Sequence, residues 1–214
     1  MNAQLQNERA KRKKKDLAPL ALFGRVATLP AVLALAVLVT VFFMRPEVYI
    51  RPYELYLSIL FLLVFPVLAY PIAKLVPSLR AQGREGARNT AFITSLVGYL
   101  AAVLYTHIAL SSEELCFIAE TYFFSAVLLF FCNKAVGIRA SAHSCGAAGA
   151  AVLFGAVMGG VAWLISALVF LFARWSSLSL RRHDGKEFFY GALCVLGGFM
   201  LASVCTTGFS LIFA

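Results

Sequence analysis

The stretch RWSSLSLRRHDGKEFFYG, residues 174–191, lies between two long hydrophobic runs and holds four cationic side chains, a histidine and two carboxylates. Charge is scarce elsewhere, because Asp, Glu, Lys and Arg make up only 14% of the 214 residues, whereas a typical soluble domain has about 25%. Hydrophobic residues make up 61% of the chain. This composition predicts a membrane protein with several spans, and it makes the charged stretch a candidate functional segment.

The apolar segments around this stretch are expected to be helices, most of them close to the ~20 residues that a helix needs to cross the hydrocarbon core. Residues 143–180 are too many for one span, and Gly159 and Gly160 lie near the middle, so we predict a hairpin of two short helices there. Pro66 and Pro71 predict a kink or a break in the second segment. The expected fold is all-α, a polytopic transmembrane bundle of about six to seven helices formed by residues 26–44, 53–75, 91–110, 115–132, 144–158, 161–178 and 188–213.

The first 25 residues are expected to form a basic, disordered, cytoplasmic tail, and residues 26–214 one transmembrane domain. The tail contains KRKKK at residues 11–15, and such a block of like charge stays disordered and lies against an anionic membrane face. No small-residue cleavage pattern follows it, so we interpret the first apolar segment as a retained anchor and not as a signal peptide. The rest of the chain gives no support for a nucleic-acid partner.

The loops of this arrangement sort the charges onto one face. All but Arg45 and Arg51 of the 19 lysine and arginine residues fall on the face that carries the N-terminus and the charged stretch. Cytoplasmic loops carry an excess of Lys and Arg. We therefore expect a multi-pass protein of the bacterial inner (cytoplasmic) membrane with a cytoplasmic N-terminus. The opposite face balances its two arginines with Glu47, Glu54, Glu113 and Glu114.

Within the charged stretch, His183 and Glu187 are four residues apart. On a helix this spacing places two side chains on one face, one turn apart, so the carboxylate can orient the imidazole. With Arg181 and Arg182 beside it, such a histidine suits attack on a phosphate group, or proton transfer to one. A second interpretation stays open, in which the stretch is a basic juxtamembrane loop that holds lipid headgroups.

A second polar cluster, at residues 133–146, includes Arg139, Ser141 and His143 just before a run of small residues. A helix N-terminus with free N–H groups suits an oxyanion. Because the predicted hairpin returns the chain to the same face, His143 and His183 can meet, and two histidines can supply a nucleophile and a general acid. The alternative is that each histidine lies in a solvated interfacial loop.

Other ionisable residues receive no such role. Glu120 is an intramembrane carboxylate that needs a partner or water. His107 lies near the opposite face without basic neighbours in the sequence, and we assign it no function. The five cysteines lie in or beside apolar runs at irregular spacing, which favours packing over disulfides or zinc. We expect neither a metal nor another cofactor.

The two polar clusters resemble the second and third signature motifs of the type 2 phosphatidic acid phosphatase superfamily. Those motifs read Pro-Ser-Gly-His and then Ser-Arg, five residues, His, three residues, Asp. Ser141 and His143 match the second motif, in which Ala140 and Ala142 replace the proline and the glycine. Arg139 fits divergent members that carry a basic residue before Ser-x-His.

In the third motif His183 matches the histidine, and Glu187 takes the aspartate position. Ser177 stands where the family has arginine, which is the most serious departure; Arg174, one helical turn earlier, and Arg181 are candidate replacements. The first motif is not present as written, and Arg88, with Arg84 in reserve, is the best candidate for its place. The resemblance covers roughly residues 84–191.

The resemblance implies that His183 forms a phosphohistidine, that Glu187 holds its ring and that His143 protonates the leaving oxygen. It also implies that Arg88, Arg139, Arg182 and the Ser141 hydroxyl bind the phosphate oxygens without a metal. The expected protein is a lipid phosphate phosphatase acting on a phosphatidate, a phosphatidylglycerol phosphate or a polyprenyl diphosphate. Family members often act at the extracytoplasmic face, whereas the charge distribution here favours the cytoplasmic one.

Two other functions stay open. Because Ser177 replaces the motif arginine, the protein could be an inactive relative that binds anionic lipid or scaffolds a partner. A transporter is less favoured, because no inverted repeat is visible and the polar groups gather at one face and not at the midplane.

Overall fold

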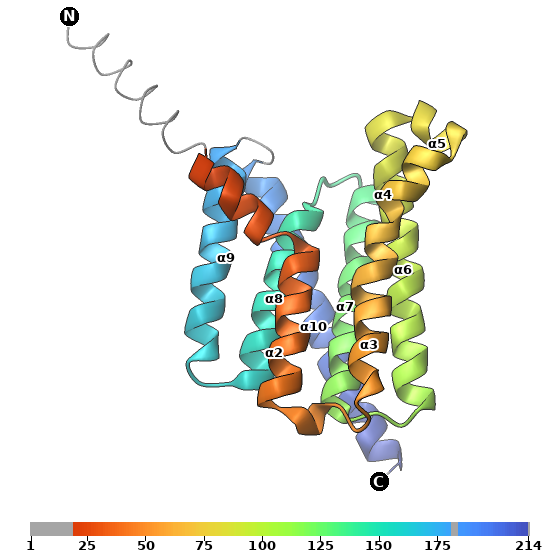
Figure 1. Cartoon of the computed structure of the whole chain (residues 1–214), viewed down its shortest axis with the longest axis vertical. Coiled ribbons are helices and arrows are strands. Elements are labelled where there is room, and N and C mark those ends of the chain that lie inside the picture. Colours follow the sequence, from red (N-terminus) through yellow and green to blue (C-terminus); the bar gives the residue numbers. More distant parts are fainter. Residues whose placement is uncertain (1–18, 181–183, 214) are drawn as a thin grey trace, which may run out of the picture.

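The computed structural model describes residues 19–180 and 184–213, and their side chains as far as Thr206. Within these ranges the chain is helical and contains no strand (Figure 1). A helical segment, Pro19–Ala27, comes first. It is followed by α2 (Pro30–Met44), α3 (Tyr53–Ile59), α4 (Phe65–Leu75), α5 (Pro77–Ala81), α6 (Gly83–Ile108), α7 (Glu113–Lys134), α8 (Ala142–Met158), α9 (Ala162–Ser179) and α10 (Gly185–Phe213).

Each of the seven apolar segments predicted from the sequence is largely helical, so the prediction of an all-α, polytopic bundle is confirmed. Five helices among the described residues are long and apolar enough to cross a membrane. The bent pair formed by Pro19–Ala27 and α2 makes a sixth if it counts as one span, and α8 is apolar but shorter. The five are Tyr53–Leu75, Gly83–Ile108, Glu113–Lys134, Ala162–Ser179 and Gly185–Thr206.

The first segment differs from the prediction in two ways. Helix begins at Pro19, so the last residues of the range 1–25, which we expected to be disordered, are ordered, and Ala21 is buried. A bend of 51° then separates Pro19–Ala27 from α2. Its cause is Pro30, because a residue before proline avoids the helical region, and Leu29 is accordingly extended (φ −58°, ψ 138°).

The second segment, Tyr53–Leu75, is continuous, so of the two predicted outcomes a break is wrong. Its irregularity is a π-helical stretch, Leu60–Val64, immediately before the first proline. There the Phe65 N–H donates to Leu60 O, five residues back, and the wider turn accommodates the local change before Pro66, which has no N–H of its own.

The predicted hairpin is confirmed. α8 and α9 are joined by Gly159 and Gly160, whose φ angles of 65° and 47° are in the left-handed region that glycine adopts readily. The chain therefore reverses direction at this point and returns to the end of the bundle from which α8 started (Figure 1).

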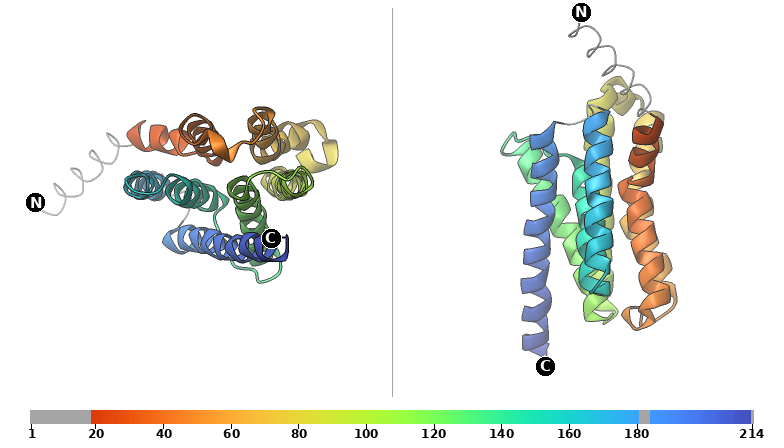
Figure 2. Two further views of the ribbon diagram at one scale, coloured as in Figure 1. Left: turned by 90° about the horizontal axis from the view of Figure 1, so that it is seen from below. Right: turned by 90° about the vertical axis from the view of Figure 1, so that its left-hand side faces the viewer.

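The helices form layers around α7 and α8. Seen from below (Figure 2), α2 and α3–α4 form one layer, α6 to α9 a second, and α10 lies outside α7 and α8. A buried cluster that includes Leu38, Val41, Ile118 and Leu153 holds the first two layers together. Contact between α7 and α10 depends on Gly198, because a Cβ there would lie 2.4 Å from Ser125 Oγ; small residues allow such close helix packing in membranes.

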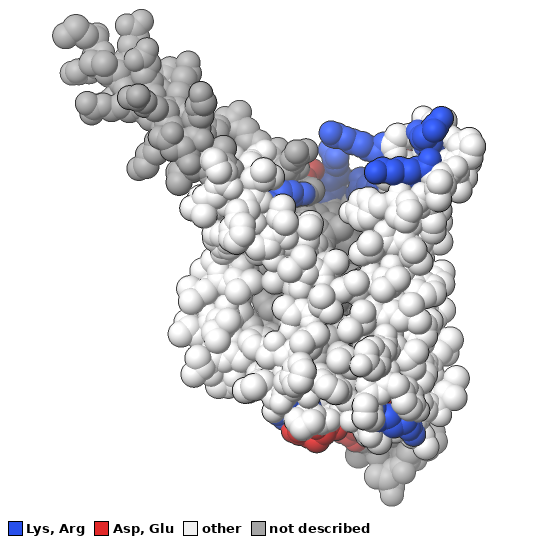
Figure 3. Space-filling view, viewed as in Figure 1, with Lys and Arg blue, Asp and Glu red and all other residues white. Residues whose placement is uncertain are grey.

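Charged side chains gather at the two ends of the bundle (Figure 3). We call one end the basic end: it carries the α4–α6 connection, the α7–α8 loop and the start of α10. The other, the opposite end, carries the α2–α3, α6–α7 and α8–α9 connections (Figure 1). This is the distribution of loops that the sequence predicts.

Candidate functional site

The start of α8 packs against the start of α10 at the basic end. The Ser141 N–H donates to Glu187 O at 2.9 Å, and the Ser144 hydroxyl donates to Phe188 O at 2.5 Å. Close approach requires Gly191, because a Cβ there would lie 2.3 Å from Ser141 O. The two polar segments singled out in the sequence are therefore neighbours in space.

Glu187 faces the α7–α8 loop. Its Oε1 atom lies 3.5 Å from Arg139 Nε, and the Glu187 side chain is 20% exposed whereas that of Arg139 is 78% exposed. The Arg139 guanidinium is thus largely open to solvent beside a partly buried carboxylate. The structure brings these two predicted site residues together.

His183, with Arg181 and Arg182, lies outside the described residues. The assumed spacing between His183 and Glu187 therefore also lies outside the described residues, in which α10 begins at Gly185 and Asp184 is not helical. The Glu187 N–H donates to Asp184 Oδ1 at 2.7 Å. Asp184 therefore caps the helix, as aspartate commonly does.

His143 is the second residue of α8 and is only 6% exposed. It therefore does not lie in a solvated loop, and that alternative is wrong for this histidine. Ser141 is also buried, and its hydroxyl accepts a hydrogen bond from the Ser144 N–H at 3.3 Å. This bond caps the N-terminus of α8, so the Ser141 side chain already has a structural partner.

Arg88, on α6, reaches the chain that leads into α8. It donates to the side-chain oxygen of Asn133, and its guanidinium lies 5.7 Å from the Phe92 ring centroid. The Asn133 side chain also accepts from the Ala140 N–H at 3.2 Å and donates to Ala140 O at 3.1 Å. Asn133 thus joins α6, α7 and the loop before α8. The sequence analysis placed this residue at the start of the polar cluster but did not predict these contacts.

Of the two reserve arginines, Arg84 is exposed in the first turn of α6 and Arg174 is exposed on α9. Ser177, at the position of the missing motif arginine, is fully buried. The guanidinium that reaches it is that of Arg25, whose Nη1 donates to Ser177 Oγ at 3.2 Å. A cation from the helix Pro19–Ala27, which the sequence analysis did not single out, therefore contacts the position where the motif has arginine.

At the opposite end, Glu120 is 2% exposed, and both of its carboxylate oxygens have a hydrogen-bond partner. Its Oε1 atom lies 2.8 Å from His107 Nε2, and its Oε2 atom accepts from the Thr206 hydroxyl at 2.9 Å. His107, to which we assigned no function, is thus the partner that this buried carboxylate needs.

The arginines of the opposite end are bound to carboxylates and carbonyls. Arg51 Nη1 lies 3.3 Å from Oε1 of the fully buried Glu54 and donates to Ala109 O at 2.9 Å. Arg45 pairs with Glu47 and donates to Val157 O at 2.7 Å. These contacts link the α2–α3 connection to the ends of α6 and α8, and so they stabilise the fold.

The basic end can bind an anion. It presents Arg139 to solvent, whereas Arg88 donates to the amide oxygen of Asn133 and Arg25 to the hydroxyl of Ser177. Among the described residues, no three His, Cys, Asp or Glu side chains are grouped to hold a metal ion. Comparison with models of protein families, with curated proteins and with solved structures finds no match for this chain.

Proposed function

We propose that this protein is a membrane-embedded phosphatase that removes phosphate or diphosphate from a lipid, as members of the type 2 phosphatidic acid phosphatase superfamily do. The observation that carries the proposal is the contact between Ser141 and Glu187. These residues belong to two motif-like segments that are far apart in the sequence, and the contact joins the start of α8, which carries His143, to the start of α10, which carries Glu187.

The substrate class follows from where these groups lie. The polar cluster is at the end of apolar helices long enough to cross a membrane, at the level where the phosphate of a lipid lies when its chains remain in the bilayer. Phosphatidates, phosphatidylglycerol phosphates and polyprenyl diphosphates all have this form. The excess of Lys and Arg at this end supports a cytoplasmic location, in the bacterial inner membrane.

In the proposed reaction an imidazole nitrogen of His183 attacks phosphorus, and the bond from phosphorus to the lipid oxygen breaks. His143 donates a proton to the departing oxygen, and water then hydrolyses the phosphohistidine. Arg139, Arg88 and Arg182 stabilise the charge that develops on the non-bridging oxygens. Arg25 adds the cation that Ser177 lacks. No step uses a metal or another cofactor.

A second function is a catalytically inactive, lipid-binding or scaffolding relative. Two observations favour it: Ser177 replaces the motif arginine, and the Ser141 hydroxyl is occupied as a helix cap. In that case the cations of the basic end bind an anionic headgroup without turnover.

Phosphate release by the purified full chain from a panel of phosphorylated lipids, in chelator and without added metal, distinguishes the two functions. We expect release by the wild type and its loss in His183→Ala. His107→Gln changes a histidine at the opposite end and is expected to retain turnover, which makes it the matched control. Lipid binding without phosphate release in the wild type would support the inactive relative.

A further inference from the structure

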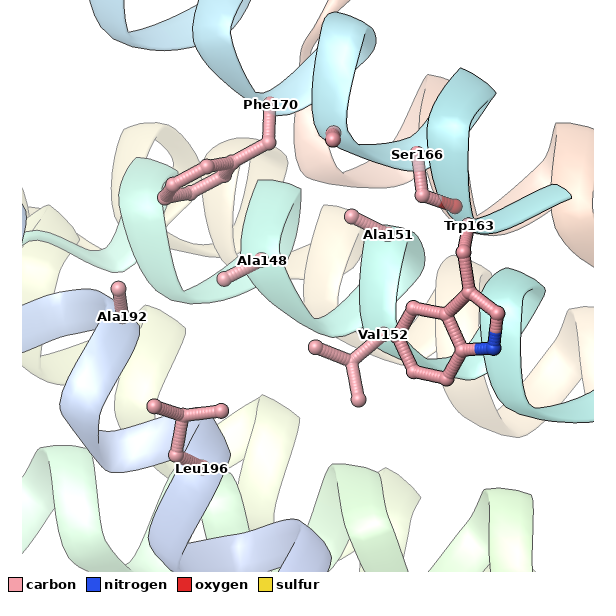
Figure 4. Close-up of a pocket in the computed structure, with 9 residues that line it drawn as sticks. Ala148, Ala151, Val152, Trp163, Ser166, Phe170, Ala192 and Leu196 are labelled. Atoms are coloured by element: carbon pink, nitrogen blue, oxygen red, sulfur yellow. The ribbon is translucent and has the colours of Figure 1, made fainter. Parts of the chain in front are cut away.

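A cavity of about 250 Å³ opens between α8, α9 and α10 (Figure 4). Small side chains on α8 and α10 form its inner wall, and Trp163, Ala167 and Phe170 form the α9 side. The described lining is apolar apart from Ser166. This cavity lies within the apolar part of helices that are long enough to span a membrane.

The cavity exists because α9 and α10 both pack on α8 and, in the described chain, do not pack along each other. They touch near the basic end, where the ring centroids of Phe170 and Phe188 are 5.5 Å apart. Below that contact the inner wall is formed by Ala148 and Ala192, whose side chains are too short to fill the space. The result is a groove, which we call the α9–α10 groove.

Helical periodicity links this groove to the basic end. Ala148 lies one turn, about 6 Å, below Ser144 on α8, and Ala192 lies one turn below Phe188 on α10. Ser144 and Phe188 are themselves joined by a hydrogen bond of 2.5 Å. The faces that carry the polar contact therefore continue directly into the groove.

We propose that the α9–α10 groove holds one hydrocarbon chain of the lipid whose phosphate lies at the basic end. This inference rests on the proposed function for the identity of the headgroup. A single extended chain is narrow enough, and its methylene groups match the apolar lining.

The probe is a phosphatidic acid with a diazirine in one acyl chain, added to the full chain in phospholipid nanodiscs. After irradiation, peptide mapping gives the labelled residues. We expect label on groove residues of all three helices, such as Val152, Ala167 and Leu196, in preference to Leu164 and Leu171 on the lipid-facing surface of α9. Label spread evenly over exposed apolar side chains would overturn the proposal.

Filling the groove is the second measurement. Ala167→Phe narrows it, and we expect groove labelling to fall about fivefold, which corresponds to on the order of 1 kcal/mol of lost packing. Leu168→Phe adds an aromatic ring at the next residue, which is exposed outside the groove, and is expected to leave labelling unchanged. The same comparison can be made on α10, where Ala192→Phe narrows the groove and Leu193→Phe, at the next residue, is the control. If one groove variant fails to fold, the other still tests the proposal.

Phosphate release measured in the same nanodiscs separates this inference from the proposed function. Groove labelling without phosphate release means that the phosphatase proposal fails and the chain site stands. If phosphate is released but neither groove variant reduces labelling, the phosphatase proposal stands and the chain site fails. A diacylglycerol carrying the same diazirine is expected to label the groove more weakly, because it has no phosphate to hold; equal labelling would overturn the link between the groove and the basic end.

Discussion

The two ends of the bundle use arginine differently. At the opposite end, Arg45 and Arg51 are paired with carboxylates, including the fully buried Glu54, and also donate to main-chain carbonyls. At the basic end, Arg25 donates to a hydroxyl and Arg88 to an amide oxygen. Arg139 lies beside a carboxylate but is largely exposed.

This difference indicates that the arginines of the opposite end stabilise the fold and that those of the basic end are candidates for binding a ligand. A guanidinium and a carboxylate form a pair of zero net charge, whereas a hydrogen bond to a neutral oxygen does not by itself compensate the charge of a guanidinium. The arginines of the opposite end therefore stabilise connections between helices, whereas the basic end presents a largely exposed guanidinium, that of Arg139, beside a partly buried carboxylate. Mutations at corresponding groups of the two ends should change different measurements.

The histidines give the largest expected contrast. His143→Ala should lower phosphate release by about 10²–10⁴-fold, the usual contribution of a general acid. His107→Ala should leave turnover per folded molecule nearly unchanged but lower stability by roughly 1–3 kcal/mol, because Glu120 loses its partner. Initial rates and thermal unfolding in detergent measure both. Equal loss of turnover in the two variants would contradict the division between the ends.

Glu54→Ala is the next largest effect and concerns stability. Removing this buried carboxylate leaves Arg51 and the Ser111 hydroxyl, which donates to it at 2.7 Å, without their acceptor, and we expect a loss of about 3 kcal/mol. Turnover at the other end of the bundle should be unaffected. Glu113→Ala, which removes an acidic side chain from the first turn of α7, is the control and should cost much less. A fall in turnover without a fall in unfolding temperature would be the contrary result.

A smaller effect is expected at Arg25. Arg25→Ala removes a charged donor from Ser177, and we expect about tenfold slower phosphate release, since hydrogen bonds from charged groups contribute roughly 1.5–3 kcal/mol. Arg174→Ala, which changes an exposed arginine on the neighbouring helix, should have less effect. If Arg174→Ala is the more damaging of the two, the original sequence interpretation of Arg174 is the better one.

The helices could be predicted from sequence because their signal is local. A run of about 20 apolar residues must be a helix in a membrane, since every backbone group needs an internal partner, and Gly159 with Gly160 marks the hairpin. The start of α10 at Gly185, three residues before the predicted segment, also has a local cause, because the Asp184 side chain accepts a hydrogen bond from the Glu187 N–H and caps the helix.

The site contacts could not be predicted in the same way. Arg25 meets Ser177 across 152 residues, and Arg88 meets Asn133 across 45, and neither pair has a periodic pattern in the sequence. The contact between His107 and Glu120 was not predicted, because the sequence analysis compared the charges of whole loops. The α6–α7 connection brings these two side chains together inside the bundle. What sequence reasoning did predict was that the two motif-like segments lie at one end.

The smallest expected effect lies in the exposed ion pair of the opposite end. A hydrogen bond from Arg45 lowers the pKa of Glu47, so the folded protein binds a proton there less readily than the unfolded chain does. The pair therefore stabilises the fold at pH values above the ordinary glutamate pKa, and this contribution disappears as the pH falls through the lowered value. Glu47→Gln should unfold at a slightly lower temperature than the wild type at neutral pH and at the same temperature in acid. Because both side chains are exposed, added salt should also shrink the difference. A difference that persists in acid would show that Glu47 acts through packing and not through its charge.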